Sequence, residues 1–119
     1  MPQVFTKAKL SGSTNGKAIK IAATATAGTT VHTAVAGTAA YDELYLYLNN
    51  TSASAVTYTI EYGGVTDPDC LVGKAVSLPP NSGPILVIPG LLINNTLVVA
   101  VFCGTANVVL ASGFVNQIV

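Results

Sequence analysis

Residues 41–62 place the strongest constraint on the fold, because apolar and polar side chains alternate along two runs with a period of two. On a β-strand, the first run would separate leucines from polar and aromatic groups: Leu44, Leu46 and Leu48 against Glu43, Tyr45 and Tyr47. The second run separates its residues in the same way: Val56, Tyr58, Ile60 and Tyr62 against Thr57, Thr59 and Glu61. A short polar loop joins the runs, so the pattern predicts a β-hairpin with its leucines facing the core.

The rest of the chain repeats this signal in shorter form. Runs of four to eight residues are separated by Gly, Pro and Asn turns, and no segment has helical periodicity. Residues 96–103 are apolar on both faces, as expected of a central strand. The sequence therefore predicts an all-β fold: an antiparallel β-sandwich of about eight strands, with jelly-roll or Greek-key order.

The length of 119 residues predicts one domain, preceded by a short polar leader. We expect an N-terminal arm at 1–16 and a β-sandwich domain at 17–119. Val4, Phe5 and Leu10 are isolated apolar residues in the arm, and a loop of Ser, Gly, Thr and Asn follows them. Such an arm cannot bury these groups on itself, so we expect it to contact a partner through them.

Charge is scarce, which limits the classes of partner. Charged residues make up 8% of the chain, against about 25% in an ordinary soluble protein, and the formal net charge is zero. No basic stripe is present to neutralise phosphates, so nucleic acid is not an expected partner. The apolar window 84–103 is divided by Pro89-Gly90 and by a second turn at 94–96, so we expect no membrane span. No secretory signal follows Met1, and we expect a surface suited to packing against protein.

No set of residues predicts catalysis, a cofactor or a metal, and we do not expect an enzyme. His32 is the only histidine and is interpreted as an ordinary strand residue. Asp42 and Glu43 are adjacent, so on a strand they face opposite sides and do not form a pair of catalytic carboxylates. Both are interpreted as solvated residues at a strand start. Asp67 and Asp69, with Glu61 before them, lack the spacing of a calcium loop, and the two aspartates are interpreted as turn caps.

Two further pairs leave alternatives open. Cys70 and Cys103 are favoured as free thiols acting as small buried hydrophobes, and a single disulfide remains the alternative. Tyr45 and Tyr47 are expected on the outer face of their sheet. There they would either bind a sugar or a protein neighbour, or pack across strands on a covered face.

Several segments resemble small structural proteins of tailed bacteriophages. The similarity lies in residues 3–21, 59–69, 86–92, 106–109 and 112–116, which are distributed along the length of the chain. The shared motifs are strands and turns without catalytic signatures.

The resemblance implies a virion protein, specifically a capsid decoration (cement) protein on the outer capsid surface. It would be made in the cytoplasm of the bacterial host, bind the major capsid protein as a homo-oligomer (dimer or trimer) and stabilise the shell. Val4, Phe5, Leu10, Tyr45 and Tyr47 are the expected contacts with capsid or neighbouring subunits. The alternative is a carbohydrate-binding module of a tail or fibre, with Tyr45 and Tyr47 as its platform.

Overall fold

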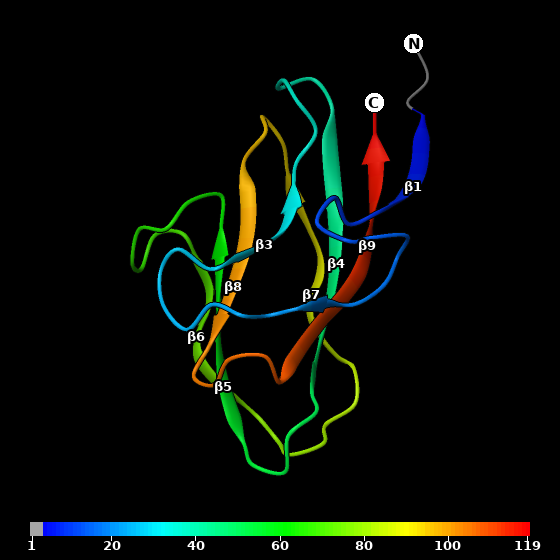
Figure 1. Ribbon diagram of the computed structural model, residues 1–119. Helices are drawn as coiled ribbons and strands as arrows, with labels where there is room; N and C mark the ends of the chain where they lie inside the picture. Colours follow the sequence, from blue (N-terminus) through cyan, green and yellow to red (C-terminus); the bar gives the residue numbers. More distant parts are fainter. Residues whose placement is uncertain (1–3) are drawn as a thin grey trace.

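The computed structural model describes residues 4–119, and these form nine β-strands and no helix (Figure 1). The strands are β1 (Phe5–Lys9), β2 (Ile19–Lys20), β3 (Thr29–Thr33), β4 (Tyr41–Asn50), β5 (Val56–Tyr62), β6 (Leu71–Leu78), β7 (Ile85–Ile93), β8 (Val98–Cys103) and β9 (Val109–Ile118). They lie in two antiparallel sheets, as the sequence predicts. Since these residues form no helix, they supply no helix that could cross a membrane.

The strand order is that of a jelly roll. Sheet A has the order β1-β9-β4-β7, with β2 also on β9, and sheet B has the order β3-β8-β5-β6. The chain folds back on itself at the β5–β6 turn and makes four nested antiparallel pairs: β5 with β6, β4 with β7, β3 with β8, and β1 with β9. Successive pairs alternate between the two sheets, so each sheet contains two of them.

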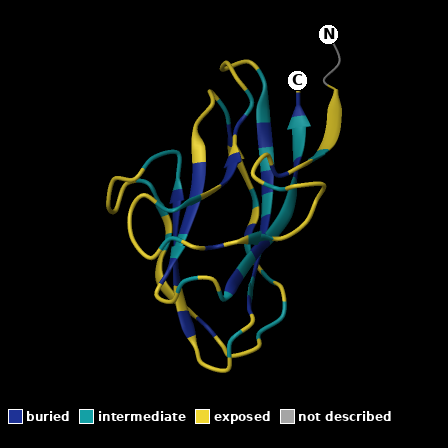
Figure 2. Ribbon diagram, in the orientation of Figure 1, coloured by how far each residue is buried: buried dark blue, intermediate teal, exposed yellow. Residues whose placement is uncertain are grey.

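The core lies between the sheets and follows the alternation in the sequence. Buried and half-buried residues alternate along all ten positions of β4, and Leu44, Leu46 and Leu48 are completely buried. Buried residues concentrate along the central strands and exposed ones along loops and edges (Figure 2). Strand β8 lies between β3 and β5, which confirms its predicted central position.

The predicted hairpin over residues 41–62 is wrong, because β4 and β5 lie in different sheets. Alternation reports which face a residue occupies and does not report which strand lies beside it. The connection crosses from one sheet to the other and is fastened by Asn50, which is fully buried. The Asn50 Nδ2 donates to the carbonyl oxygens of Ser54, at 2.9 Å, and of Pro79, at 3.1 Å.

Two long strands continue through glycines, and one strand is very short. Strand β7 continues through Pro89-Gly90 with a shift in register, and β9 continues through Gly113. A Cβ on Gly113 would collide with the Tyr45 carbonyl oxygen, and the φ of +154° also favours glycine. Strand β2 has two residues, which pair with β9.

The N-terminal residues are more closely tied to the sandwich than expected of an arm. All five residues of β1 pair with β9, and the neighbouring Val4 exchanges two backbone hydrogen bonds with Val119. Leu10 is 1% exposed and belongs to the core. The prediction that Leu10 is a free apolar anchor is therefore wrong. Leu10 is an isolated apolar residue in the sequence, and no local pattern predicts that the following loop folds back against Val31.

Candidate functional site

The outer face of sheet A carries a set of aromatic and apolar side chains that no second layer from residues 4–119 covers; each is half-buried or exposed. Residues directly opposite one another in register share a face, which groups side chains from four strands. We call this set the aromatic face: Lys7, Lys9, Glu43, Tyr45, Tyr47, Leu86, Leu92, Phe114 and Asn116. Leu92 is 57% exposed and Leu86 43%, so the face presents apolar surface to solvent.

A row of stacked groups crosses this face perpendicular to the strands. The rings of Tyr45 and Phe114 are 4.8 Å apart between centroids and 16° from parallel. The Lys7 Nζ lies 4.7 Å from the Phe114 centroid, within the range of a cation–π contact. The far end of the Tyr45 ring lies over Gly90, where a Cβ would come within 3.1 Å of Cζ. The row therefore runs from Lys7 on β1 to Gly90 on β7, with Phe114 stacked on one side of the Tyr45 ring.

Polar contacts also fix the side chains around this row. The Asn116 Nδ2 donates to Glu43 Oε1 at 3.0 Å across β9 and β4. The pKa of Tyr45 is raised above its ordinary value, first by partial removal from water and then by the negative charge of Glu43. The Tyr45 hydroxyl therefore stays protonated to a higher pH than that of an ordinary tyrosine. Of its two expected roles, the structure shows cross-strand packing, on a face that is uncovered.

The five expected contact residues are only partly brought together. Tyr45 and Tyr47 lie on the aromatic face, and Phe5 shares that side of β1 because it precedes Lys7 by two residues. Phe5 is 68% exposed at the end of the sheet. Val4 is exposed beside it, whereas Leu10 is in the core.

Each outer strand edge has a feature that hinders the addition of another strand. Strand β1 carries Lys7, and β6 carries Lys74 next to an irregular pairing with β5. Strand β7 contains Pro89 and two register shifts. On the free side of β3, the backbone of Gly12 donates to the Val31 carbonyl at 3.0 Å. Charges, proline and bulges protect sheet edges from pairing, so we expect contacts through faces.

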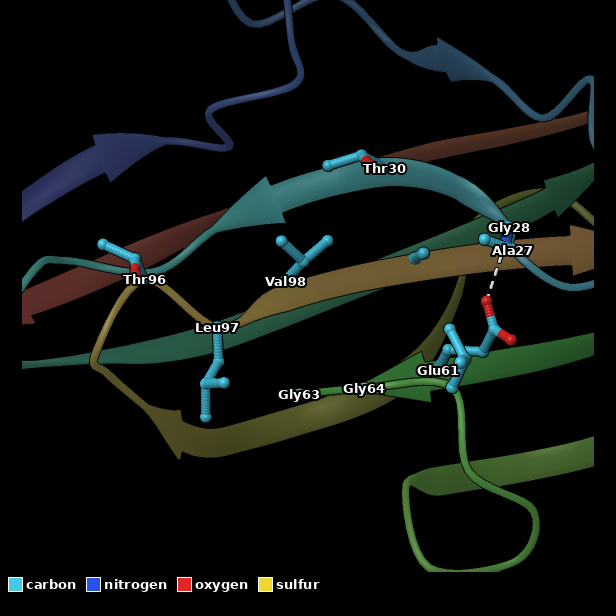
Figure 3. Close-up of a pocket in the computed structure, with 11 residues that line it drawn as sticks. Ala27, Gly28, Thr30, Glu61, Gly63, Gly64, Thr96, Leu97 and Val98 are labelled. Atoms are coloured by element: carbon cyan, nitrogen blue, oxygen red, sulfur yellow. Dashed lines mark hydrogen bonds between the residues drawn. The ribbon is translucent and has the colours of Figure 1, made fainter.

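A pocket of about 290 Å³ lies on the outer face of sheet B (Figure 3). Its walls are mostly small and apolar: Ala27, Gly28, Thr30, Gly63, Gly64, Val65, Thr96, Leu97, Val98 and Ala100. Glu61 lies at one end, rising from β5 toward Gly28, and Leu97 and Thr96 lie at the other (Figure 3). The pocket forms because the loop between β2 and β3 folds over sheet B.

Glu61 is 1% exposed and held by neutral donors. Its Oε2 accepts from the Thr26 hydroxyl at 2.6 Å, and its Oε1 accepts from the Gly28 backbone N–H at 2.7 Å. Alternation along β5 placed Glu61 away from the core, which is correct, yet the covering loop buries it. Nothing in the sequence near Glu61 indicates that this loop returns to it.

Asp42 is not the solvated residue that the sequence suggested. It is 1% exposed, and its Oδ2 lies 2.7 Å from His32 Nε2 and accepts from the Val35 N–H at 3.1 Å. The Ser11 backbone N–H donates to His32 Nδ1 at 3.0 Å. A backbone N–H can only donate, so Nδ1 accepts and Nε2 carries the proton toward Asp42.

Ser11, His32 and Asp42 are therefore neighbours, but their arrangement differs from that of a hydrolase triad. The Ser11 Oγ accepts from the Thr33 backbone N–H at 2.6 Å instead of facing the imidazole. A nucleophile must hydrogen-bond to its base. His32 is therefore a strand residue, as predicted, whose contacts join the two sheets.

The described residues contain no group of three or more His, Cys, Asp and Glu side chains that would hold a metal ion. Cys70 and Cys103 are both free, in agreement with the favoured interpretation, although only Cys103 is fully buried. Burial raises the pKa of the Cys103 thiol to about 11. Its thiol is therefore protonated and unreactive near neutral pH.

Comparisons with protein-family models, curated proteins and solved structures give no match to this chain. The class of protein is therefore defined by the fold, an all-β jelly-roll sandwich, and by two surfaces, the aromatic face and the Glu61 pocket.

Proposed function

We propose that this protein is a structural virion protein, a capsid decoration (cement) protein that binds the outside of the major capsid protein shell and stabilises it. The observation that carries the proposal is the aromatic face, an ordered and uncovered sheet surface on a protein with little charge. The resemblance to small tailed-phage structural proteins supplies the identity of the partner.

The aromatic face suits a protein partner because its side chains are already fixed. Tyr45 is stacked on Phe114 and lies close to Gly90 at its hydroxyl end, so it loses little conformational freedom when another protein covers it. Leu86 and Leu92 beside it provide apolar area, and Tyr is enriched at protein interfaces.

The fold agrees with this proposal at the level of analogy. Jelly rolls occur in viral capsid proteins and in lectins, so the architecture suits both the decoration protein and the tail or fibre module. Fold alone does not assign function. The geometry of the tyrosines must discriminate between these two candidates.

Sugar-binding platforms need an open aromatic ring face, and stacking on Phe114 covers one face of the Tyr45 ring. Gly90 also lies close to the hydroxyl end of that ring, which restricts access to it. Tyr47 remains as a single aromatic group, beside Leu86 on β7. This arrangement favours a protein partner over a glycan, and with it the decoration protein over the tail or fibre module.

Because a shell offers many identical binding sites, each single contact between this protein and the shell could be weak. As a dimer or trimer on the regular lattice of a shell, the protein would engage several sites at once. Linked sites can raise the effective affinity by about 10²–10⁴-fold without any new contact. The absence of a basic stripe agrees with a position away from the packaged nucleic acid.

The test adds purified protein to phage shells that lack it and measures the number of copies bound at saturation. We expect hundreds of copies on each shell, with Leu92→Glu weakening binding by about tenfold because it places a charge in the contact. The matched control is Val76→Glu on β6, at a residue of similar type that is 41% exposed. Failure to bind shells would contradict the proposed function. Equal binding by Leu92→Glu and wild type would show that the aromatic face is not the contact.

A further inference from the structure

Glu61 is a buried carboxylate without a counter-charge. Within the part of the chain that the structure describes, the ion pair is Lys74 with Asp67, and the other close contact of a carboxylate with a basic side chain is His32 with Asp42; neither includes Glu61. Its two hydrogen bonds come from an uncharged hydroxyl and an uncharged backbone amide. Buried charges in proteins are normally paired, because removal from water is costly.

The carboxylate also has acceptor capacity left. A carboxylate offers about four lone-pair directions, and Thr26 and Gly28 use two of them. The neutral donors thus satisfy part of its hydrogen bonding and leave its charge uncompensated. What the site lacks is a cation that also donates hydrogen bonds.

The shape of the pocket narrows the class of cation. From Glu61 the cavity extends along apolar walls to Leu97 and Val98 and opens on the surface (Figure 3). A volume of about 290 Å³ accommodates a four-carbon chain. A bare metal ion would find one carboxylate, whereas Ca²⁺ takes six to eight oxygen ligands. The apolar wall would contact a methylene stem while the charged end reaches the carboxylate.

We propose that the Glu61 pocket binds a lysine side chain of a partner protein, with the ammonium group on the Glu61 carboxylate and the methylenes along Leu97 and Val98. Lysine fits better than arginine because its ammonium is a compact point charge on an unbranched apolar stem, which matches one carboxylate at the end of a mostly apolar pocket. This inference rests on the proposed function only for the identity of that partner.

A peptide titration tests the site without any shell. The labelled full-length protein is titrated with the tripeptide acetyl-Ala-Lys-Ala-amide, and the amide resonances of Gly28, Gly63 and Gly64 are followed by NMR. The comparison peptide contains norleucine, which has the apolar stem without the charge. We expect saturable shifts with the lysine peptide and about tenfold weaker binding with norleucine, together with weakening at high salt.

Glu61→Gln is the matched variant. Its amide keeps an acceptor for the Gly28 N–H and provides a donor toward the Thr26 hydroxyl, so the charge is removed with little change in shape. We expect it to bind the lysine peptide about as weakly as wild type binds norleucine. Glu43→Gln, on the opposite sheet, should bind like wild type. Because the norleucine comparison uses the wild-type protein, the test survives even if Glu61→Gln fails to fold.

Three results would overturn the inference: equal binding of the two peptides, wild-type affinity in Glu61→Gln, or no saturable shift at the three glycines. Binding to shells without binding to the lysine peptide would support the proposed function and contradict this site. Binding to the peptide without binding to shells would support the site and contradict the proposed partner.

Discussion

The His32 Nε2 and Asp42 Oδ2 lie 2.7 Å apart in the core and join the two sheets, since His32 is on β3 of sheet B and Asp42 on β4 of sheet A. Ser11 completes the unit by donating its backbone N–H to the other ring nitrogen. One imidazole therefore connects the N-terminal segment, sheet B and sheet A.

We predict that Asp42→Ala lowers the free energy of unfolding by about 2–6 kcal/mol, because it leaves the His32 and Val35 donors without an acceptor, at about 1–3 kcal/mol each. Urea unfolding at pH 7 measures the change. Glu43→Ala is the control and should cost less than about 1 kcal/mol, since Glu43 is only half-buried on the aromatic face. A smaller loss for Asp42→Ala than for Glu43→Ala would contradict the role of this pair.

We predict that Tyr62 makes the free energy of unfolding depend on pH in the alkaline range. Burial, and then the charge of Asp42, raises the pKa of Tyr62 from 10.0 to about 12. The folded state therefore favours the protonated hydroxyl. Its contribution is fully present below pH 10 and is lost as the pH rises toward 12. Urea unfolding across this range should show a smaller loss of stability in Tyr62→Phe than in wild type.

Tyr62→Phe should also be neutral or slightly stabilising at pH 7. Among the described residues, the Tyr62 hydroxyl is buried without a hydrogen-bond partner, so its removal leaves no other group unpaired. A loss of more than about 2 kcal/mol at pH 7 would show that the hydroxyl has a partner in solution.

The N-terminal strand predicts opposite outcomes for two nearby apolar residues. Leu10→Ala should cost about 2–5 kcal/mol because Leu10 is in the core. Phe5→Ala should change stability by less than about 1 kcal/mol, because the ring is mostly exposed. Thermal unfolding of both variants provides the comparison, and equal melting temperatures would contradict the packing of this segment. Deletion of residues 1–10 should accordingly lower the melting temperature.

The cysteines should differ in the same way. Cys103→Ser places a hydroxyl in the core and should cost about 1–3 kcal/mol, whereas Cys70→Ser should be milder, since Cys70 is only half-buried. A reducing agent should leave the unfolding midpoint of wild type unchanged, because both thiols are free. A lower midpoint under reducing conditions would indicate a disulfide.

The sequence predicted which face of a strand each residue occupies better than it predicted which strands pair with each other. The leucines of β4 are buried as their period of two requires, and the two antiparallel sheets follow from the turns between short runs. The hairpin prediction failed because period and loop length are the same whether the next strand pairs or crosses to the other sheet. Pairing is decided by long-range contacts such as those of Asn50.

The candidate sites were predictable only in part. Tyr45 and Tyr47 were placed on the outer face correctly, since alternation fixes that side. Phe114 and Gly90 come from strands far away in sequence, and no local pattern linked them to Tyr45. Asp42 was interpreted as solvated and Glu61 was placed only on the face away from the core, because the residues that bury and pair them lie about 10 to 35 positions away.

A reconstruction of the phage particle tests the central claim most directly. The account predicts density for this protein outside the shell in hundreds of copies, with the aromatic face around Tyr45 and Leu92 turned toward the shell or a neighbouring subunit. Density confined to the tail in tens of copies or fewer, or an aromatic face turned entirely to solvent, would contradict it.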